Sequence, residues 1–255
     1  AEDRTAARSP LPRPLAPGEW VELEIEFSAQ MPEIFARTGA HRDFVLGGQW
    51  FPKIGVFEDA GMRGRAEAGW NTHQFHANSE FYADFGDYDV RLELPARFAG
   101  RIGATGRLVS EEVEGDTVRA RFVQKGVHDF AWTADPRFLV VEDRFDPDRD
   151  VPPEQAEAVA RVLGVPVDEL RLQPVAIRLL LQPAHRGQAE RYMEAARAAL
   201  RGYGLRLGAY PYETLTMVDP PRGGLGAGGM EYPTFITLGT HPLLEVPGFT
   251  RLRAP

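Results

Sequence analysis

The sequence predicts a mostly β domain over residues 1–183, followed by an α+β segment over residues 184–255. Two observations lead to this prediction. Between residues 19 and 182, short segments with apolar residues at every second position recur, separated by glycine and proline. This pattern is typical of antiparallel strands. After Pro183 a helical period is followed by short apolar segments, which favours a helix packed on a sheet.

The elements of the first domain follow from these patterns. Residues 1–18 are rich in proline and charge, and we expect a loop there. Residues 20–28 alternate apolar side chains with three glutamates, which predicts a half-buried strand. Apolar spacing near the helical period predicts one helical insert over residues 152–163, ended by Gly164. Further strands are predicted at residues 88–94, 118–122, 137–142 and 175–182.

The second segment opens with a predicted helix over residues 188–203, whose apolar side chains form one stripe. Gly202 and Gly204 are expected to end this helix. Thr214 to Val218 is a predicted strand, and Met230 to Leu238 is another. A glycine-rich loop joins the two strands.

Composition excludes several function classes. The chain of 255 residues carries a net charge of -8 and has no long basic run, which argues against a nucleic-acid partner. It has no cysteine, so disulfides, thiolate zinc sites and cysteine nucleophiles are excluded. No run of about 18 apolar residues is present, and therefore no transmembrane segment is predicted.

The glycine-rich loop, residues 221–233, is the most unusual feature of the sequence. Gly224, Gly226 and Gly229 fit G-x-G-x-x-G, but a dinucleotide site requires a helix directly afterwards, and Pro233 disfavours one. One interpretation is a plain surface loop. The other is a peptide site, because glycines let a backbone approach a ligand and a following strand can pair with an extended peptide. Glu231 would then bind the α-ammonium of the peptide.

The six histidines do not form a recognisable metal motif. None lies in His-Glu-x-x-His, and the nearest pair, His73 and His76, has no acidic residue between its members. We interpret both as structural and assign no metal ligand. An acidic cluster follows, which we interpret as solvated turn carboxylates: Glu80, Asp84, Asp87 and Asp89.

The segment Gly228-Gly-Met-Glu-Tyr232 resembles the Gly-x-Met-Glu-Asn signature of M1 (gluzincin) zinc aminopeptidases. Other segments resemble that family in the same order along the chain, in a divergent bacterial branch. The resemblance implies part of a saddle-like N-terminal β domain and the start of a thermolysin-like catalytic domain. The segments are residues 49–53, 78–86, 127–132 and 208–212.

The resemblance implies a zinc aminopeptidase that removes N-terminal residues from peptides with a free N-terminus. In this chain Glu231 would anchor the substrate amine, and the backbone of Gly228, Gly229 and Met230 would line the peptide site. Gln49 lies in the segment that could supply a second group to hold the amine, and the alternative interpretation is an ordinary polar residue at a strand end. The zinc ligands and the catalytic base are expected after Pro255, so no catalytic residue is assigned here. Tyr232 stands where the family has Asn.

Two alternatives remain open at this point. One is a non-catalytic relative that binds peptides or a partner protein. The other is a structural β module whose glycine-rich segment is only a loop. The sequence does not specify the compartment, although the resemblance is to enzymes that are often exported or membrane-associated.

Overall fold

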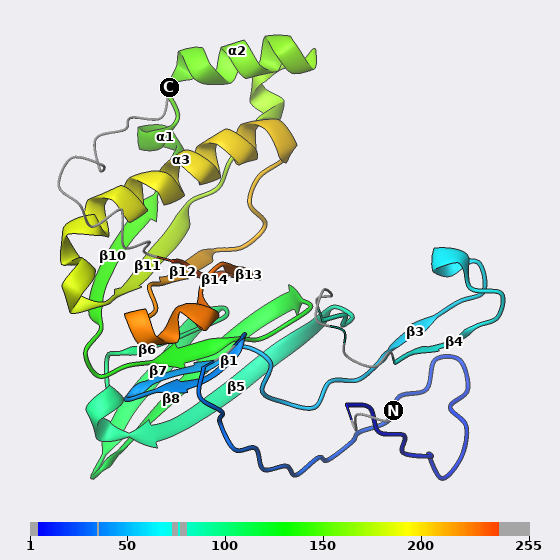
Figure 1. Ribbon diagram of the computed structural model, residues 1–255. Helices are drawn as coiled ribbons and strands as arrows, with labels where there is room; N and C mark the ends of the chain where they lie inside the picture. The colour runs from blue at the N-terminus through cyan, green and yellow to red at the C-terminus, as the bar shows by residue number, and fades with distance from the viewer. Residues whose placement is uncertain (1–4, 35, 73–75, 77–80, 240–255) are drawn as a thin grey trace.

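The structure is a computed structural model that describes residues 5–34, 36–72, 76 and 81–239. Antiparallel sheets form the N-terminal part, and a long helix with a mixed sheet follows (Figure 1). The predicted class, mostly β followed by α+β, is therefore confirmed. The thermolysin-like character of the second part stays a prediction.

Two antiparallel sheets form most of the N-terminal part. The first has the strand order β1 (Thr38–His41), β2 (Phe44–Gly47), β9 (Trp132–Ala134) and β6 (Ile102–Ala104). The second has the order β5 (Gly86–Pro95), β8 (Thr117–Val127) and β7 (Arg107–Glu114). The strands predicted at residues 88–94 and 118–122 pair with each other in β5 and β8. Their apolar sides bury a core that includes Leu92, Ala120, Phe122, Phe130 and Trp132.

A separate hairpin projects from this part of the molecule (Figure 1). It consists of β3 (Val56–Glu58) and β4 (Gly69–Asn71), joined through the short 3-10 helix η1 (Met62–Gly64). The buried Glu58 carboxylate accepts hydrogen bonds from Asn71, Tyr82 and Arg65. These contacts hold the two strands of the hairpin together around one carboxylate.

The mixed sheet has five strands and supports the C-terminal part. Its order is β10 (Leu139–Phe145), β11 (Val175–Leu181), β12 (Thr214–Val218), β14 (Phe235–Thr237) and β13 (Met230–Tyr232). Strands β11, β12 and β14 are parallel, whereas β10 and β13 are antiparallel edges. Strands β10 and β11 of this sheet precede residue 184, and the other three follow it. The domain boundary that the sequence predicts near residue 184 stays a prediction.

One face of this sheet is covered by α3 (Ala189–Leu207), which connects β11 to β12. Met193, Ala196 and Leu200 pack on Ile177 and Leu215 of the sheet. The helix is present as predicted, but the predicted end at Gly202 and Gly204 is wrong. It continues to Leu207, and Gly208 with φ 109° ends it.

The insert between β10 and β11 contains two helices. They are α1 (Pro147–Asp150) and α2 (Pro153–Leu163), so the helix predicted over residues 152–163 is confirmed. Gly164 adopts a left-handed φ of 69° at its end, a conformation that glycine accepts without steric cost. The remaining 3-10 helices are η2 (Ala96–Phe98), η3 (Val167–Glu169), η4 (Pro183–Gln188) and η5 (Arg222–Ala227).

The other face of the mixed sheet packs on the first antiparallel sheet. Phe44 and Leu46 of β2 share a buried cluster with Leu180, Val218 and Phe235 of the mixed sheet. Gly103 of β6 makes this approach possible, since a Cβ on it would lie 2.3 Å from Leu180 Cδ1. Hydrogen bonds cross the same interface from Thr216 Oγ1 to the Ala104 carbonyl (3.3 Å) and from Gly106 N to Thr234 Oγ1 (2.6 Å).

Two predicted strands differ in the structure. Residues 20–28 have the predicted alternation but pair with no strand in the described part of the chain, and Trp20 is 81% exposed. A strand requires a neighbouring backbone for its N–H and C=O groups, and alternation alone does not supply one. Residues 230–238 form the hairpin β13–β14 rather than one strand, because Pro233 and Thr234 (φ 60°) form a turn.

Candidate functional site

The glycine-rich segment packs against the first antiparallel sheet. Within η5, a Cβ on Gly223 would lie 2.1 Å from the His41 ring, and one on Gly224 would lie 3.3 Å from Phe44 Cδ1. A side chain at Gly223 would force the His41 ring to move, whereas glycine allows this close approach of the backbone. The segment that makes this contact leads directly into β13 along the chain.

Strand β13 forms an edge of the mixed sheet. Gly229 N donates to the Thr237 carbonyl (2.9 Å), and Met230 N donates to Thr237 Oγ1 (3.0 Å), so both N–H groups face β14. On its other side β14 bonds to β12, since the Thr234 carbonyl accepts from Thr216 N and Leu238 N donates to the Val218 carbonyl. The backbone groups of Ile236, which lies between them, face β12 as well, and Glu231 is the residue opposite Ile236. The N–H and C=O of Glu231 therefore point away from β14, where the described residues supply no further strand.

The side chains of β13 alternate between the two faces of the sheet. Tyr232 is 2% exposed and packs with Met230 in the cluster that contains Phe44. Glu231 lies opposite Ile236 on the other face, and its side chain is exposed. Its carboxylate is therefore accessible to a ligand at the sheet edge.

Tyr232, at the position where the signature has Asn, contacts the segment that contains Gln49. A Cβ on Gly48 would lie 2.2 Å from Tyr232 Oη and 1.9 Å from the Arg37 carbonyl oxygen. Thr38 Oγ1 fixes the same segment by accepting from Gly48 N (3.2 Å) and Gln49 N (2.7 Å). The structure thus brings the backbone before Gln49 against β13, while no hydrogen bond or ion pair among the described residues joins Gln49 to Glu231.

Two of the segments that resemble the family meet in the structure. Gln49 Nε2 donates to Asp129 Oδ2 (2.5 Å), and Trp50 Nε1 donates to the Phe130 carbonyl (3.0 Å). Lys53 Nζ lies 2.7 Å from Asp129 Oδ2. Residues 49–53 and 127–132 therefore form one polar cluster beside an aromatic core.

Burial and charge act against each other in this cluster. Burial lowers the pKa of the Lys53 ammonium, and the hydrogen bond and charge of Asp129 oppose that effect. Burial raises the pKa of the neighbouring Tyr88 hydroxyl, and the Asp129 carboxylate raises it further. The carboxylate is thus the negative centre around which the cluster is organised.

A second buried polar group was missed by sequence reasoning. Asp219 Oδ2 accepts from Gln182 N (3.1 Å) and lies 2.7 Å from His185 Nδ1. Gln182 Nε2 donates to Asp135 Oδ2 (3.0 Å). Gln182 and Asp219 directly follow the neighbouring parallel strands β11 and β12. The sequence feature that could have indicated their contact is this shared position, because the carboxyl ends of adjacent parallel strands lie side by side.

Of the histidines and acidic residues singled out in the sequence, those that the structure describes do not gather into a metal site. His73, Glu80 and His241 lie outside the described residues. Asp89 forms two hydrogen bonds with Arg121 (2.9 and 2.7 Å), and Asp87 accepts from Gly126 N (3.0 Å). Among the residues that the structure describes, no three His, Asp or Glu side chains are grouped to hold a metal ion.

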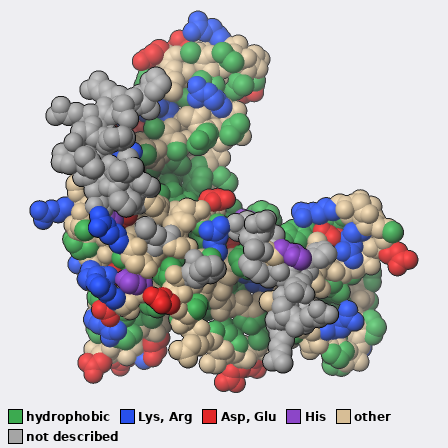
Figure 2. Space-filling model, in the orientation of Figure 1, with side chains coloured by type: hydrophobic (Ala, Val, Ile, Leu, Met, Phe, Trp, Pro, Cys, Tyr) green, Lys and Arg blue, Asp and Glu red, His purple; other side chains and the backbone are tan. Residues whose placement is uncertain are grey.

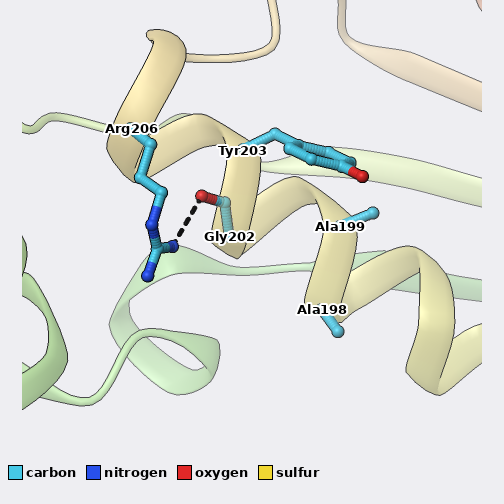
Figure 3. Close-up of a pocket in the computed structure, with 5 residues that line it drawn as sticks. All are labelled: Ala198, Ala199, Gly202, Tyr203 and Arg206. Atoms are coloured by element: carbon cyan, nitrogen blue, oxygen red, sulfur yellow. Dashed lines mark hydrogen bonds between the residues drawn. The ribbon is translucent and has the colours of Figure 1, made fainter. Parts of the chain in front are cut away.

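Two hollows of the surface, both beside α3, are lined by none of the predicted site residues. One of about 470 Å³ lies on the outer side of α3 (Figure 3). Arg206 there donates to the Gly202 carbonyl (3.0 Å). Figure 2 shows a broader recess between the helical layer and the β3–β4 hairpin, and in Figure 1 β13 ends the mixed sheet on the side of that hairpin. The residues that line the α3 hollow are Ala198, Ala199, Gly202, Tyr203 and Arg206.

Comparison with known proteins adds no assignment. Neither a scan against models of protein families nor a search of curated proteins found a match for this chain. In the described part of the chain, no helix is both long and apolar enough to cross a membrane. The resemblance to M1 aminopeptidases therefore rests on the sequence segments and stays a prediction.

Proposed function

We propose that this chain supplies the amine- and peptide-binding part of a zinc aminopeptidase. The observation that supports this most is β13, which begins directly after Gly228 and Gly229 and is the last strand of the mixed sheet among the described residues. Its central residue, Glu231, combines an exposed carboxylate with an N–H and a C=O that point away from the sheet.

These groups suit a peptide that adds to the sheet as a further strand. The outward N–H and C=O of Glu231 can form main-chain hydrogen bonds with an extended peptide. The Glu231 carboxylate can accept a charge-assisted hydrogen bond from the α-ammonium of the peptide. Recognition of that ammonium would select peptides with a free N-terminus.

Zinc in such an enzyme polarises the scissile carbonyl and activates a water molecule. The resemblance implies that the ligands of this metal lie after Pro255. What this chain contributes is binding and orientation of the substrate, through Gln49 and through the carboxylate and outward backbone groups of Glu231. The N–H groups of Gly229 and Met230 bond to Thr237 within the hairpin and do not pair with the peptide.

Replacing the anchor tests the proposal. In the protein as its gene encodes it, Glu231→Gln should lower kcat/KM for leucine p-nitroanilide by about 10- to 100-fold, the usual value of a hydrogen bond to a charged group. The zinc content should not change. Glu213→Gln is the matched control, because Glu213 is an exposed carboxylate just before β12. Equal kinetics in both variants would refute the anchor role.

A non-catalytic peptide-binding protein is the second candidate. It is favoured by Tyr232, which departs from the family signature and is buried in the core rather than presented at the edge. The sequence after Pro255 distinguishes the two candidates. His-Glu-x-x-His with a further Glu about eighteen residues later supports the enzyme, whereas replaced ligands support the binding protein.

A further inference from the structure

The Asp129 carboxylate is almost fully enclosed by partners. It is 4% exposed, and its Oδ1 accepts from Phe130 N (2.7 Å). Its Oδ2 accepts from Gln49 Nε2 (2.5 Å) and lies 2.7 Å from Lys53 Nζ. A buried carboxylate is tolerated only with such pairing, because desolvation of an isolated charge is costly.

Lys53 supplies the compensating charge. Its side chain is 16% exposed, and its ammonium lies 5.4 Å from the centre of the Phe51 ring. The aromatic surroundings favour the ammonium through the negative face of the ring. The Asp129 carboxylate thus lies between this cation and the Gln49 amide.

An ionised carboxylate determines which way the Gln49 amide faces. Carboxylate oxygens only accept hydrogen bonds, whereas a glutamine amide has a donating NH₂ and an accepting oxygen. The NH₂ of Gln49 must therefore face Asp129, and Oε1 remains as the accepting atom. Gln49 is only partly buried.

We propose that Asp129 is a positioning residue, which holds the Gln49 amide so that Oε1 accepts a hydrogen bond from the substrate α-ammonium. This inference rests on the proposed function, which makes the ligand an ammonium. An ammonium only donates hydrogen bonds and therefore requires an accepting atom. An Asn at position 129 could present either its oxygen or its NH₂ to Gln49, and the orientation would then be lost.

The test measures binding of two small probes by ligand-observed NMR. Isopentylamine carries the ammonium, and isopentanol has the same carbon chain without it. We expect Asp129→Asn and Gln49→Met each to raise the Kd of isopentylamine about tenfold, as for one hydrogen bond to a charged group. The Kd of isopentanol should not change in either variant.

The double variant separates positioning from general stability. If Asp129 acts through Gln49, Gln49→Met with Asp129→Asn binds isopentylamine no more weakly than Gln49→Met alone. Additive losses, or equal losses for both probes, would overturn the inference. Should Asp129→Asn alone not fold, Lys53→Met with Asp129→Asn keeps the buried pair neutral, and the same comparison applies.

Failure of the inference is distinguishable from failure of the proposed function. If Glu231→Gln weakens isopentylamine binding while the Asp129 and Gln49 variants do not, the positioning role falls and the anchor remains. If Glu231→Gln has no effect on isopentylamine binding, the proposed function falls.

Discussion

At the scale of single residues, several glycines act at points of contact rather than in flexible turns. Gly48, Gly103 and Gly223 each lie where a Cβ would come within 2.4 Å of another group. At Gly48 that group includes the backbone carbonyl of Arg37, which cannot move as a side-chain end can. This position joins β13 to the Gln49 segment.

The Gly48→Ala variant should therefore be destabilised by about 1–3 kcal/mol, the usual cost of forcing extra volume into a packed site. Urea unfolding would measure the change. Gly187→Ala is the control, because a Cβ on Gly187 meets nothing within 4 Å. If Gly48→Ala unfolds at the same urea concentration as the parent, the packing described at Tyr232 is not rigid.

At the scale of elements, α3 contains two glycines with different surroundings. Gly202 lies on the outer side, where a Cβ would approach only Arg206 Nη1 at 3.9 Å. Gly204 is buried, and a Cβ there would lie 2.9 Å from Leu172 Cδ2. Gly202 lowers the helix propensity of α3 without improving its packing. Gly204 instead allows the helix to approach the segment before β11.

Alanine at these two positions should have different effects. Gly202→Ala should stabilise the protein by about 1 kcal/mol, the difference in helix propensity between the two residues. Gly204→Ala should gain less or lose stability, because Leu172 must move. Thermal unfolding of the two variants side by side measures this. Equal stabilisation would contradict the close packing of α3 at Gly204.

At the scale of the whole molecule, one buried carboxylate links the two stacked sheets. Asp135 follows β9 of the antiparallel sheet, and it accepts from Gln182, which follows β11 of the mixed sheet (3.0 Å). The Arg137 guanidinium donates twice to the same carboxylate (3.0 and 2.7 Å), and the Arg137 backbone N–H donates once (2.9 Å). Burial by itself would raise the pKa of Asp135, but the hydrogen bonds from Arg137 and Gln182 outweigh it, and the pKa is lowered.

The sign of this shift sets the expected acid response. A carboxyl whose pKa is lower in the folded state contributes stability above its unfolded pKa, about 3.9, and loses it as the pH falls through the folded pKa. The parent should therefore exceed Asp135→Asn in unfolding free energy at neutral pH. That difference should shrink below about pH 4.

Urea unfolding from about pH 7 to about pH 2 measures the difference between parent and variant. Asp116→Asn is the control, because Asp116 is an exposed carboxylate at the β7–β8 turn. A difference between parent and Asp135→Asn that stays constant over this range would show that the Asp135 charge does not support the sheet interface.

The periodicity of apolar residues and the positions of turn residues were sufficient to predict most of the helices and strands. The strands at residues 88–94, 118–122 and 214–218, the helix at residues 152–163 and the long helix of the second part are all present. These patterns are local consequences of side-chain spacing. The turn at Pro233 and Thr234 was missed, because a non-glycine residue at φ 60° is uncommon and gives no strong signal.

The sequence by itself determined the fold class, most strands and helices, and the glycine-rich segment with Glu231 as the candidate site. Only the tertiary structure decided that residues 20–28 pair with no described strand, that β13 is a sheet edge, and that Asp129 holds Gln49. The physical reason is the distance along the chain over which each feature is decided. Side-chain spacing reports which face of an element is apolar, whereas pairing, edges and buried polar contacts depend on segments brought together from distant parts of the chain.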